Sequence, residues 1–197
     1  MKQLFLIITL CISALQICAQ SVTSGYGASS LRFDAANFTE KELTLRDGGS
    51  VKYRAYENIF FVTNVEDSVY QTVNIFIPEN ADSHSPIFLK TNIGGYMAAK
   101  AGQPTERDAT ARALQEGFVV VIPGSRGSNS KVGERWTGKA PAGLLDLKAV
   151  VRYLRFNNLA MQGDAERIIT DGTSAGGAMS SLLGATGNHP AYKPYLQ

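Results

Sequence analysis

This sequence has few cysteines, few histidines and a small net charge, and each of these features excludes a class of protein. The 197 residues include two cysteines, Cys11 and Cys18, and two histidines. A zinc site needs several such ligands, so the sequence predicts no metal centre. The formal net charge of +2 is too small to indicate a nucleic acid or an acidic membrane surface as a partner.

The N-terminal residues have the pattern of a secretory signal peptide. Lys2 supplies a positive charge, and the apolar run that follows is too short to cross a bilayer comfortably. Ala19 is small enough for cleavage, which predicts a signal peptide over 1–19 and export to the periplasm or the cell exterior. The alternative is a lipoprotein acylated on Cys18, which the bulky Ile17 disfavours. Both cysteines lie in this segment, so the exported chain would have no disulfide.

After the signal peptide the chain changes from a polar lead-in to a folded domain. Residues 20–40 are rich in serine, glycine and alanine, which predicts a flexible segment. The turn Asp47-Gly48-Gly49 lies between two β-rich runs and predicts a hairpin over 43–56. Two further strands are expected over 70–77 and 86–89.

From residue 105 onwards, strands and helices alternate. The pattern predicts helices over 105–115 and 141–157, strands over 118–122 and 168–170, and a helix after Ser174. Thr105 is the expected N-cap of the first of these helices. Uninterrupted apolar strands in this order predict a parallel sheet covered on both faces, with ligands at the carboxyl ends of its strands. Three glycine-rich loops are expected at that edge, at 92–96, 123–128 and 171–177.

The last of these loops, Gly172-Thr173-Ser174-Ala175-Gly176, has the G-x-S-x-G pattern of a nucleophile elbow. A serine hydroxyl must protrude to attack a carbonyl carbon, and a sharp turn from strand into helix achieves this. The turn brings its flanks close together, so glycine fits at 172 and 176. The expected strand before and helix after Ser174 favour a nucleophile over a turn that only permits close packing.

Two backbone amides are candidates for an oxyanion hole. The Ala175 amide follows the serine at the positive end of the expected helix. The second donor is expected from the loop at 92–96, with Gly95 as the first candidate and Gly94 as the second, because glycine lets the backbone approach a developing negative charge. An ordinary turn is the alternative for this loop.

These blocks resemble the bacterial tannases (tannin acyl hydrolases), a branch of the α/β-hydrolase superfamily related to feruloyl esterases. The resemblance covers about residue 43 to the last residue and rests on an ordered set of blocks. They lie at 92–96, 117–127, 138–153 and 163–177. The resemblance implies a truncated α/β-hydrolase fold, with residues 41–197 as the N-terminal part of a catalytic domain.

The resemblance also implies roles for single residues. Ser174 would be the nucleophile, and Gly95 and Ala175 the main-chain oxyanion donors. The implied reaction is hydrolysis of galloyl or related phenolic-acid esters through an acyl-enzyme, without a cofactor. Asp171 stands where the family has asparagine, a change that leaves this mechanism intact and can alter the floor of the pocket.

The partners of the serine are not evident in the sequence. In this fold an acidic residue and then a histidine follow the nucleophile, but after Ser174 there is no Asp or Glu, and the only histidine is His189. The intervening helix would carry His189 away by about 1.5 Å per residue, and His84 precedes the nucleophile in a polar loop. We therefore expect the N-terminal portion of a longer enzyme, inactive alone, whose last strand is an open sheet edge.

Other polar and aromatic residues have weaker signals. Arg126 follows a strand at the active edge, where a structural ion pair is favoured over contact with a substrate. Asp146 and Lys148 are expected to be solvated or locally paired. Tyr96 and Trp136 are candidates to stack on a phenol, with Tyr96 the better placed. The glycines of the elbow are no phosphate-binding loop, because no Lys-Ser/Thr pair follows them.

Three functions remain open at this point. The first is a secreted tannase-like serine esterase that acts on a small-molecule ester. The second is a general carboxylesterase or an exported serine peptidase with the same elbow. The third is a hydrolase-like module or fragment without catalysis. No nucleic-acid partner and no membrane span are expected.

Overall fold

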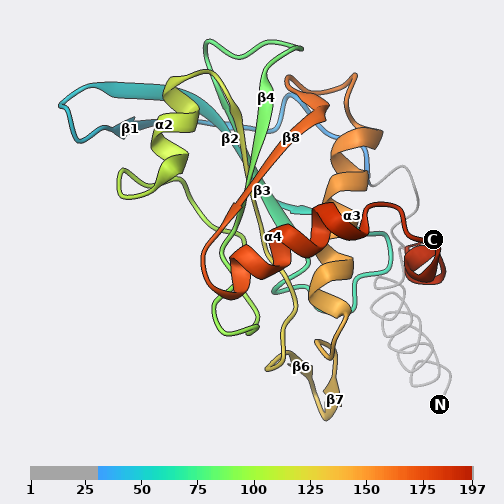
Figure 1. The fold of residues 1–197 in the computed structure, drawn as a ribbon. Helices are drawn as coiled ribbons and strands as arrows, with labels where there is room; N and C mark the ends of the chain where they lie inside the picture. Colours follow the sequence, from blue (N-terminus) through green and yellow to red (C-terminus); the bar gives the residue numbers. More distant parts are fainter. Residues whose placement is uncertain (1–30, 197) are drawn as a thin grey trace, which may run out of the picture.

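The computed structural model describes residues 31–196 (Figure 1). The predicted signal peptide, with Cys11 and Cys18, and the first part of the predicted lead-in lie outside the described residues. Within residues 31–196, no helix has the length and apolar character needed to cross a membrane.

Six strands form one mixed sheet in the order β1-β2-β3-β5-β4-β8. The strands are β1 (Thr39–Thr44), β2 (Ser50–Phe60), β3 (Thr72–Pro78), β4 (Pro86–Thr91), β5 (Val119–Pro123) and β8 (Asp164–Gly172). The first three pair antiparallel, β3 pairs antiparallel with β5, and β4 lies parallel between β5 and β8. Antiparallel strands followed by parallel strands confirm the predicted architecture, and β8 is the edge of the described sheet.

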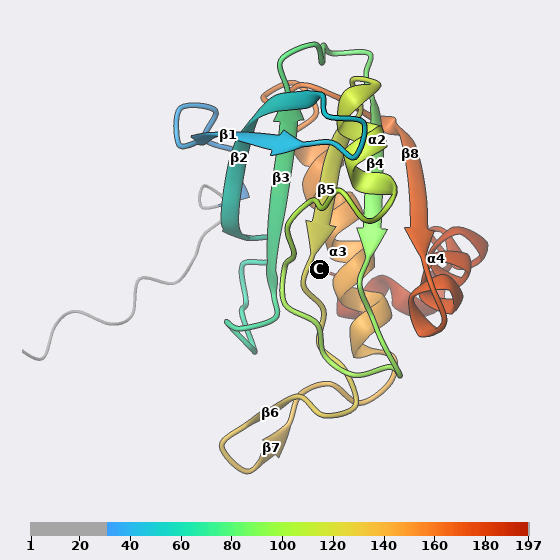
Figure 2. The same ribbon diagram turned by 90° about the vertical axis from the view of Figure 1, so that its left-hand side faces the viewer.

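Helices cover both faces of this sheet. Figure 2 looks onto the face that carries α2 (Ala109–Gln115), with α3 (Ala142–Phe156) and α4 (Ala175–Thr186) behind the sheet. Successive side chains of β5 point to opposite faces of the sheet. Val121 therefore packs in the hydrophobic cluster that includes α3, and Val120 packs in the cluster that includes α2. Both valines are fully buried, and each such burial contributes about 1.5–3 kcal/mol. The uninterrupted apolar run is therefore a strand with two buried faces.

The start of α2 differs from the prediction. Asp108, not Thr105, is the N-cap, and its carboxylate accepts a hydrogen bond from the Thr110 amide at 2.9 Å. Thr105 instead closes a turn, because its hydroxyl accepts from the Arg107 amide at 2.9 Å. The helix ends as expected before Gly117, which has a left-handed φ of 80°.

Two segments differ from the expected loops. In residues 31–40, which belong to the predicted flexible lead-in, Phe33 is buried and its amide donates to the Asn157 side chain at 2.8 Å. The Phe33 ring also packs on Tyr56, with 4.6 Å between ring centroids. A short hairpin of β6 (Lys131–Val132) and β7 (Arg135–Trp136) was not predicted, because two-residue strands are too short to show a period.

Within residues 31–196, the core contains one buried hydroxyl without a partner. Among the described residues, the side-chain oxygen of Tyr153 on α3 is buried and makes no hydrogen bond. Burial raises the pKa of the Tyr153 hydroxyl to about 12. Tyr56 offers a matched comparison, since it is equally buried and its hydroxyl donates to the Ala35 carbonyl at 3.2 Å.

Tyr153→Phe is expected to leave the free energy of unfolding unchanged or raise it by about 1 kcal/mol, because it removes a desolvated hydroxyl that gains nothing in return. Tyr56→Phe is expected to lower it by about 1 kcal/mol through the lost hydrogen bond. Urea unfolding of both variants measures the difference. A loss at Tyr153 as large as that at Tyr56 would show that the Tyr153 hydroxyl is bonded.

Candidate active site

The turn between β8 and α4 has the backbone geometry of a nucleophile elbow. Ser174 is the N-cap of α4, with φ 55° and ψ −123°, a conformation that side chains rarely adopt. Such a conformation costs about 1–3 kcal/mol and persists only where the surroundings enforce it. Ser174 is exposed, and its side chain does not cap the helix. The strained turn thus presents the hydroxyl to solvent.

Two glycines make this turn possible. A Cβ atom on Gly172 would overlap the backbone of Gly176 and the side chain of Thr91. A Cβ atom on Gly176 would lie 2.6 Å from the Thr91 carbonyl oxygen and 3.3 Å from that of Ile93. The G-x-S-x-G spacing therefore reflects two backbone segments in direct contact, as the sequence predicts for an elbow.

Thr91 holds the elbow together, and the sequence gives no signal for this role. Its hydroxyl shares its proton between the carbonyl oxygens of Asp171 at 3.0 Å and Gly176 at 2.9 Å, and lies 3.0 Å from the Ser180 hydroxyl. Thr91 is the last residue of β4 and pairs in register with Gly172 at the end of β8. One buried side chain thus joins the ends of two strands to the first turns of α4.

The predicted oxyanion loop leaves β4 beside this elbow. The Met97 amide donates to the Gly94 carbonyl at 3.0 Å, and the two residues between them, Gly95 and Tyr96, both have φ 57°. Gly94 and Gly95 are exposed, and a Cβ atom on either would meet nothing within 4 Å. Their backbone therefore borders open space at the edge where Ser174 lies.

The second candidate donor is the Ala175 amide. Ala175 is the first residue of α4, so its N–H has no acceptor within the helix. The aligned peptide dipoles of a helix place partial positive charge at this end. The amide is thus available to hydrogen bond an anion next to the serine hydroxyl.

Arg126 has the structural role that the sequence favours. Its guanidinium donates to the Asp146 carboxylate at 2.8 and 3.0 Å, to the Thr137 carbonyl at 3.2 Å, and also to Glu66. Burial alone would lower the pKa of Arg126, but the hydrogen bonds and charges of Asp146 and Glu66 outweigh it and raise this pKa. Asp146 also accepts from the Gln71 side chain at 3.0 Å. The ion pair therefore ties the loop after β5 to α3.

The expectation that Asp146 and Lys148 could be solvated is wrong. Asp146 is 1% exposed and Lys148 is 4% exposed. The Lys148 ammonium donates to the Gly187 carbonyl at 2.6 Å, just past the C-terminus of α4, and lies 4.7 Å from the centroid of the Tyr192 ring. Burial lowers the pKa of Lys148. Both residues join α3 to other elements, which a helical pattern cannot indicate.

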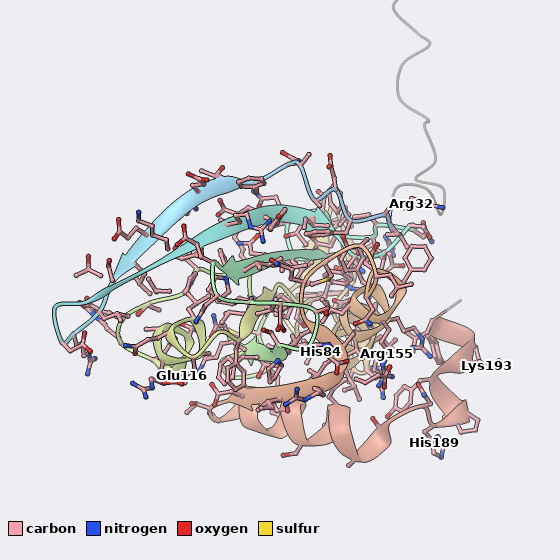
Figure 3. The ribbon with its side chains drawn as sticks, turned by 90° about the horizontal axis from the view of Figure 1, so that it is seen from above. Arg32, His84, Glu116, Arg155, His189 and Lys193 are labelled. Carbon is pink, nitrogen blue, oxygen red and sulfur yellow. The ribbon has the colours of Figure 1, made fainter. Side chains whose placement is uncertain are left out.

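Neither histidine lies near the serine. Figure 3 places His189 beside the 3-10 helix η2 (Pro190–Tyr195), where its ring accepts from the Ala191 amide at 3.3 Å. The 12-residue α4 separates it from Ser174 by about 18 Å. His84 precedes β4 and lies at the amino ends of the parallel strands, whereas Ser174 lies at their carboxyl ends. The length of β4 separates the two by about 20 Å. A general base must lie within about 3 Å of the hydroxyl or act through one water, so neither fits.

The side chains of the candidate pocket residues have different surroundings. Tyr96 is 54% exposed in the turn described above, and Trp136 is 51% exposed on β7 with the Lys131 ammonium 5.6 Å from its ring centroid. Arg126 lines a cavity of about 660 Å³ between α3, residues 61–66 and η2. None of the elbow or oxyanion residues lines this cavity. The described residues include no group of three or more His, Cys, Asp or Glu placed to hold a metal ion.

Asp171, which precedes the elbow on β8, is paired with a cation on the neighbouring strand. Its carboxylate lies 2.5 Å from the ammonium of Lys90 on the neighbouring strand. The Lys90 side chain is 12% exposed and that of Asp171 is 36% exposed. The pair is neutral as a unit, so Asp171 does not add an unpaired negative charge to the strand that leads into the elbow.

Gly172→Ala is expected to destabilise the protein by at least about 2 kcal/mol, because the new methyl group overlaps backbone that cannot move away. Gly184→Ala is the matched control in α4, where a Cβ atom meets nothing within 4 Å. It is expected to stabilise by about 0.5–1 kcal/mol through helix propensity. Thermal and urea unfolding measure both changes, and equal effects would contradict the contact at Gly172.

Asp146→Asn is expected to lower the free energy of unfolding by at least about 2 kcal/mol, because it removes the buried carboxylate of the pair and leaves only the more exposed Glu66 to balance the buried Arg126 charge. Glu134→Gln removes an exposed carboxylate that pairs with Lys131 at 3.1 Å and is expected to leave the unfolding midpoint unchanged. Urea denaturation compares the two. A wild-type midpoint for Asp146→Asn would show that the ion pair does not hold this loop.

Comparison with known proteins agrees with this geometry. The family model BD-FAE matches residues 73–195. The Fusobacterium nucleatum tannase superposes with a TM-score of 0.80 and 44% identity over 87% of this chain and 38% of that chain. The comparison with curated protein sequences gives no match.

Two tannin acyl hydrolase structures give similar values. The native structure from Lactobacillus plantarum has a TM-score of 0.79 and 34% identity over 86% of this chain and 41% of that chain. A tannin acyl hydrolase solved in complex with ethyl gallate has a TM-score of 0.79 and 33% identity over 86% and 40%. The chain spans about two fifths of the length of these relatives. It belongs to the BD-FAE family of esterase-like α/β-hydrolases and is a relative of the tannases.

Proposed function

We propose that the protein is a serine ester hydrolase with Ser174 as its nucleophile. The observation that carries this proposal is the conformation of Ser174, whose φ of 55° is maintained by the contact between Gly172 and Gly176. A turn that only connects β8 to α4 would not require a strained residue with an exposed hydroxyl, and such strain is typical of functional sites. The family and the tannase relatives support the same reaction class.

In this mechanism the Ser174 oxygen attacks the ester carbonyl carbon while a general base removes the hydroxyl proton. The carbonyl oxygen becomes an oxyanion that accepts hydrogen bonds from the Ala175 and Gly95 amides. The C–O bond to the alcohol breaks as the base returns the proton to the leaving oxygen. Water, deprotonated by the same base, then releases the acid from the acyl-enzyme.

The base and its acidic partner are proposed to come from outside these 197 residues. His84 and His189 are both distant from Ser174, and no acidic residue follows the serine in the sequence. The relatives are more than twice as long as the matched region, so they hold ample further residues. The same mechanism needs no cofactor.

The substrate is proposed to be an ester of gallic acid or a related phenolic acid. One relative was solved with ethyl gallate, and the half-exposed Tyr96 ring beside the oxyanion loop offers a face on which a phenol can stack. We also propose that the protein is exported after cleavage near Ala19. The exported protein would then encounter its phenolic ester substrate outside the cytoplasm.

The nucleophile is tested by labelling the full-length protein with a fluorophosphonate. Ser174 is expected to be modified, because the probe forms a bond only to an activated serine. Ser174→Ala should lose all labelling, while Ser181→Ala, which removes an exposed serine of α4, should retain it. Mass spectrometry of the labelled peptide identifies the site. If the correctly folded protein is not labelled, the result would favour a hydrolase-like module without catalytic activity.

The substrate class is tested by comparing kcat/KM for methyl gallate, an alkyl ester and a short peptide amide. Methyl gallate is expected to exceed the alkyl ester by at least about tenfold, since selective contacts with a phenol contribute about 1–3 kcal/mol. Equal values would favour a general carboxylesterase. Faster cleavage of the amide would favour a serine peptidase.

A further inference from the structure

The turn that presents Gly95 is strained and needs support from outside. Gly95 and Tyr96 both have φ 57°, and these are the two central residues of the turn closed by the hydrogen bond from the Met97 amide to Gly94. Both central residues have φ above zero in a type I′ turn, which glycine tolerates and tyrosine does not favour. The Tyr96 side chain is more than half exposed, so packing of its ring does not supply the missing restraint.

The restraint comes from the loop after β5. The Ser128 amide donates to the Tyr96 carbonyl at 2.8 Å, and the Ala98 amide donates to the side-chain oxygen of Asn129 at 2.7 Å. These two bonds lie on either side of Met97. They hold the turn from its far end, while β4 holds its near end.

The supporting loop is itself rigidly placed. Ala99 and Ser125 exchange two backbone hydrogen bonds of 3.0 and 2.8 Å. A Cβ atom on Gly127 would overlap the backbone of Met97 and Ala98, so the two loops pack backbone against backbone. The hydroxyl of Ser130 accepts from the Gly127 amide at 2.9 Å.

The buried ion pair completes this support. Arg126 lies next to Gly127, and both its amide and its guanidinium donate to Asp146 on α3, with 2.8 Å between the amide and the carboxylate. A continuous set of contacts therefore runs from α3 through residues 124–130 to the turn at 94–97. Of its members, Asn129 uses its side chain to bond the amide of Ala98, the residue that directly follows the turn, and it is exposed to solvent.

We propose that Asn129 is a positioning residue that holds the Gly94–Met97 turn, and with it the Gly95 amide, in the conformation that binds the oxyanion. This inference rests on the proposed esterase function. An oxyanion donor must lie about 2.7–3.1 Å from the developing charge, so a small relaxation of the turn weakens it. Because Asn129 is exposed and belongs to none of the hydrophobic clusters, it affects the transition state more than folding.

The test uses three variants of the full-length protein. Asn129→Ala removes the acceptor, Asn129→Asp keeps an oxygen in the same place, and Ser128→Ala changes the neighbouring side chain but retains the amide that bonds Tyr96. The measurements are kcat and KM for methyl gallate and p-nitrophenyl acetate, the rate of fluorophosphonate labelling at Ser174, and the thermal unfolding midpoint.

Asn129→Ala is expected to lower kcat and the labelling rate by about tenfold, less than the 10²–10³-fold loss of a deleted oxyanion donor, with KM within about twofold. Asn129→Asp is expected to stay within about threefold of the wild type, since its exposed charge is screened. Ser128→Ala is expected to match the wild type. All three should unfold at the wild-type midpoint within about 2 °C, because exposed substitutions change stability little.

Three outcomes would overturn this inference and leave the proposed function standing. One is a wild-type kcat for Asn129→Ala. The second is an equal loss for Asn129→Ala and Asn129→Asp, which would show that the acceptor oxygen is not what matters. The third is a loss of kcat that follows a lower unfolding midpoint, since that is the mark of a general structural role. If the unsubstituted protein neither labels at Ser174 nor hydrolyses either ester, the proposed function itself is wrong.

Discussion

Direct backbone contact between Gly172 and Gly176 is the constraint on which the candidate site depends. The strand β8 and the helix α4 meet so closely that the intervening Ser174 must adopt a left-handed conformation. That conformation turns its hydroxyl outward and leaves the Ala175 amide free at the start of the helix. The Thr91 hydroxyl then bonds both sides of the turn. An exposed hydroxyl and a hydrogen-bond donor are thus adjacent because two glycines lack side chains.

The same close approach of backbones recurs where the loops of the parallel strands meet. Gly127 packs against the backbone of Met97 and Ala98, and Gly138 packs against Gly127. Loops that touch in this way cannot be held by side-chain packing, so polar groups hold them. The Arg126–Asp146 ion pair is nearly excluded from solvent, where loss of one partner costs more than at the surface. In the proposed esterase, loops held in this way would place their amides without a reorganisation cost at the moment of reaction.

Sequence patterns predict antiparallel strands followed by alternating strands and helices, the burial of both faces of β5, and a sharp turn at Ser174. They do not predict the order of the strands in the sheet. The differences between pattern and structure have physical causes. Ser, Thr, Asp and Asn all suit an N-cap, so the pattern does not separate Thr105 from Asp108, which lies less than one turn further along. The pattern predicts a solvated or locally paired Lys148, because its actual partners, Gly187 and Tyr192, belong to a distant segment.

The sequence by itself determined which strands are buried on both faces and where the chain turns sharply into α4, because these features depend on residues within a few positions of one another. Only the tertiary structure decided which side chains support the site. Thr91 reaches Gly176 across 85 positions and Asn129 reaches Ala98 across 31. A hydrogen bond between segments so far apart leaves no periodic trace in the sequence, since it depends on the relative placement of two loops that only the assembled sheet creates.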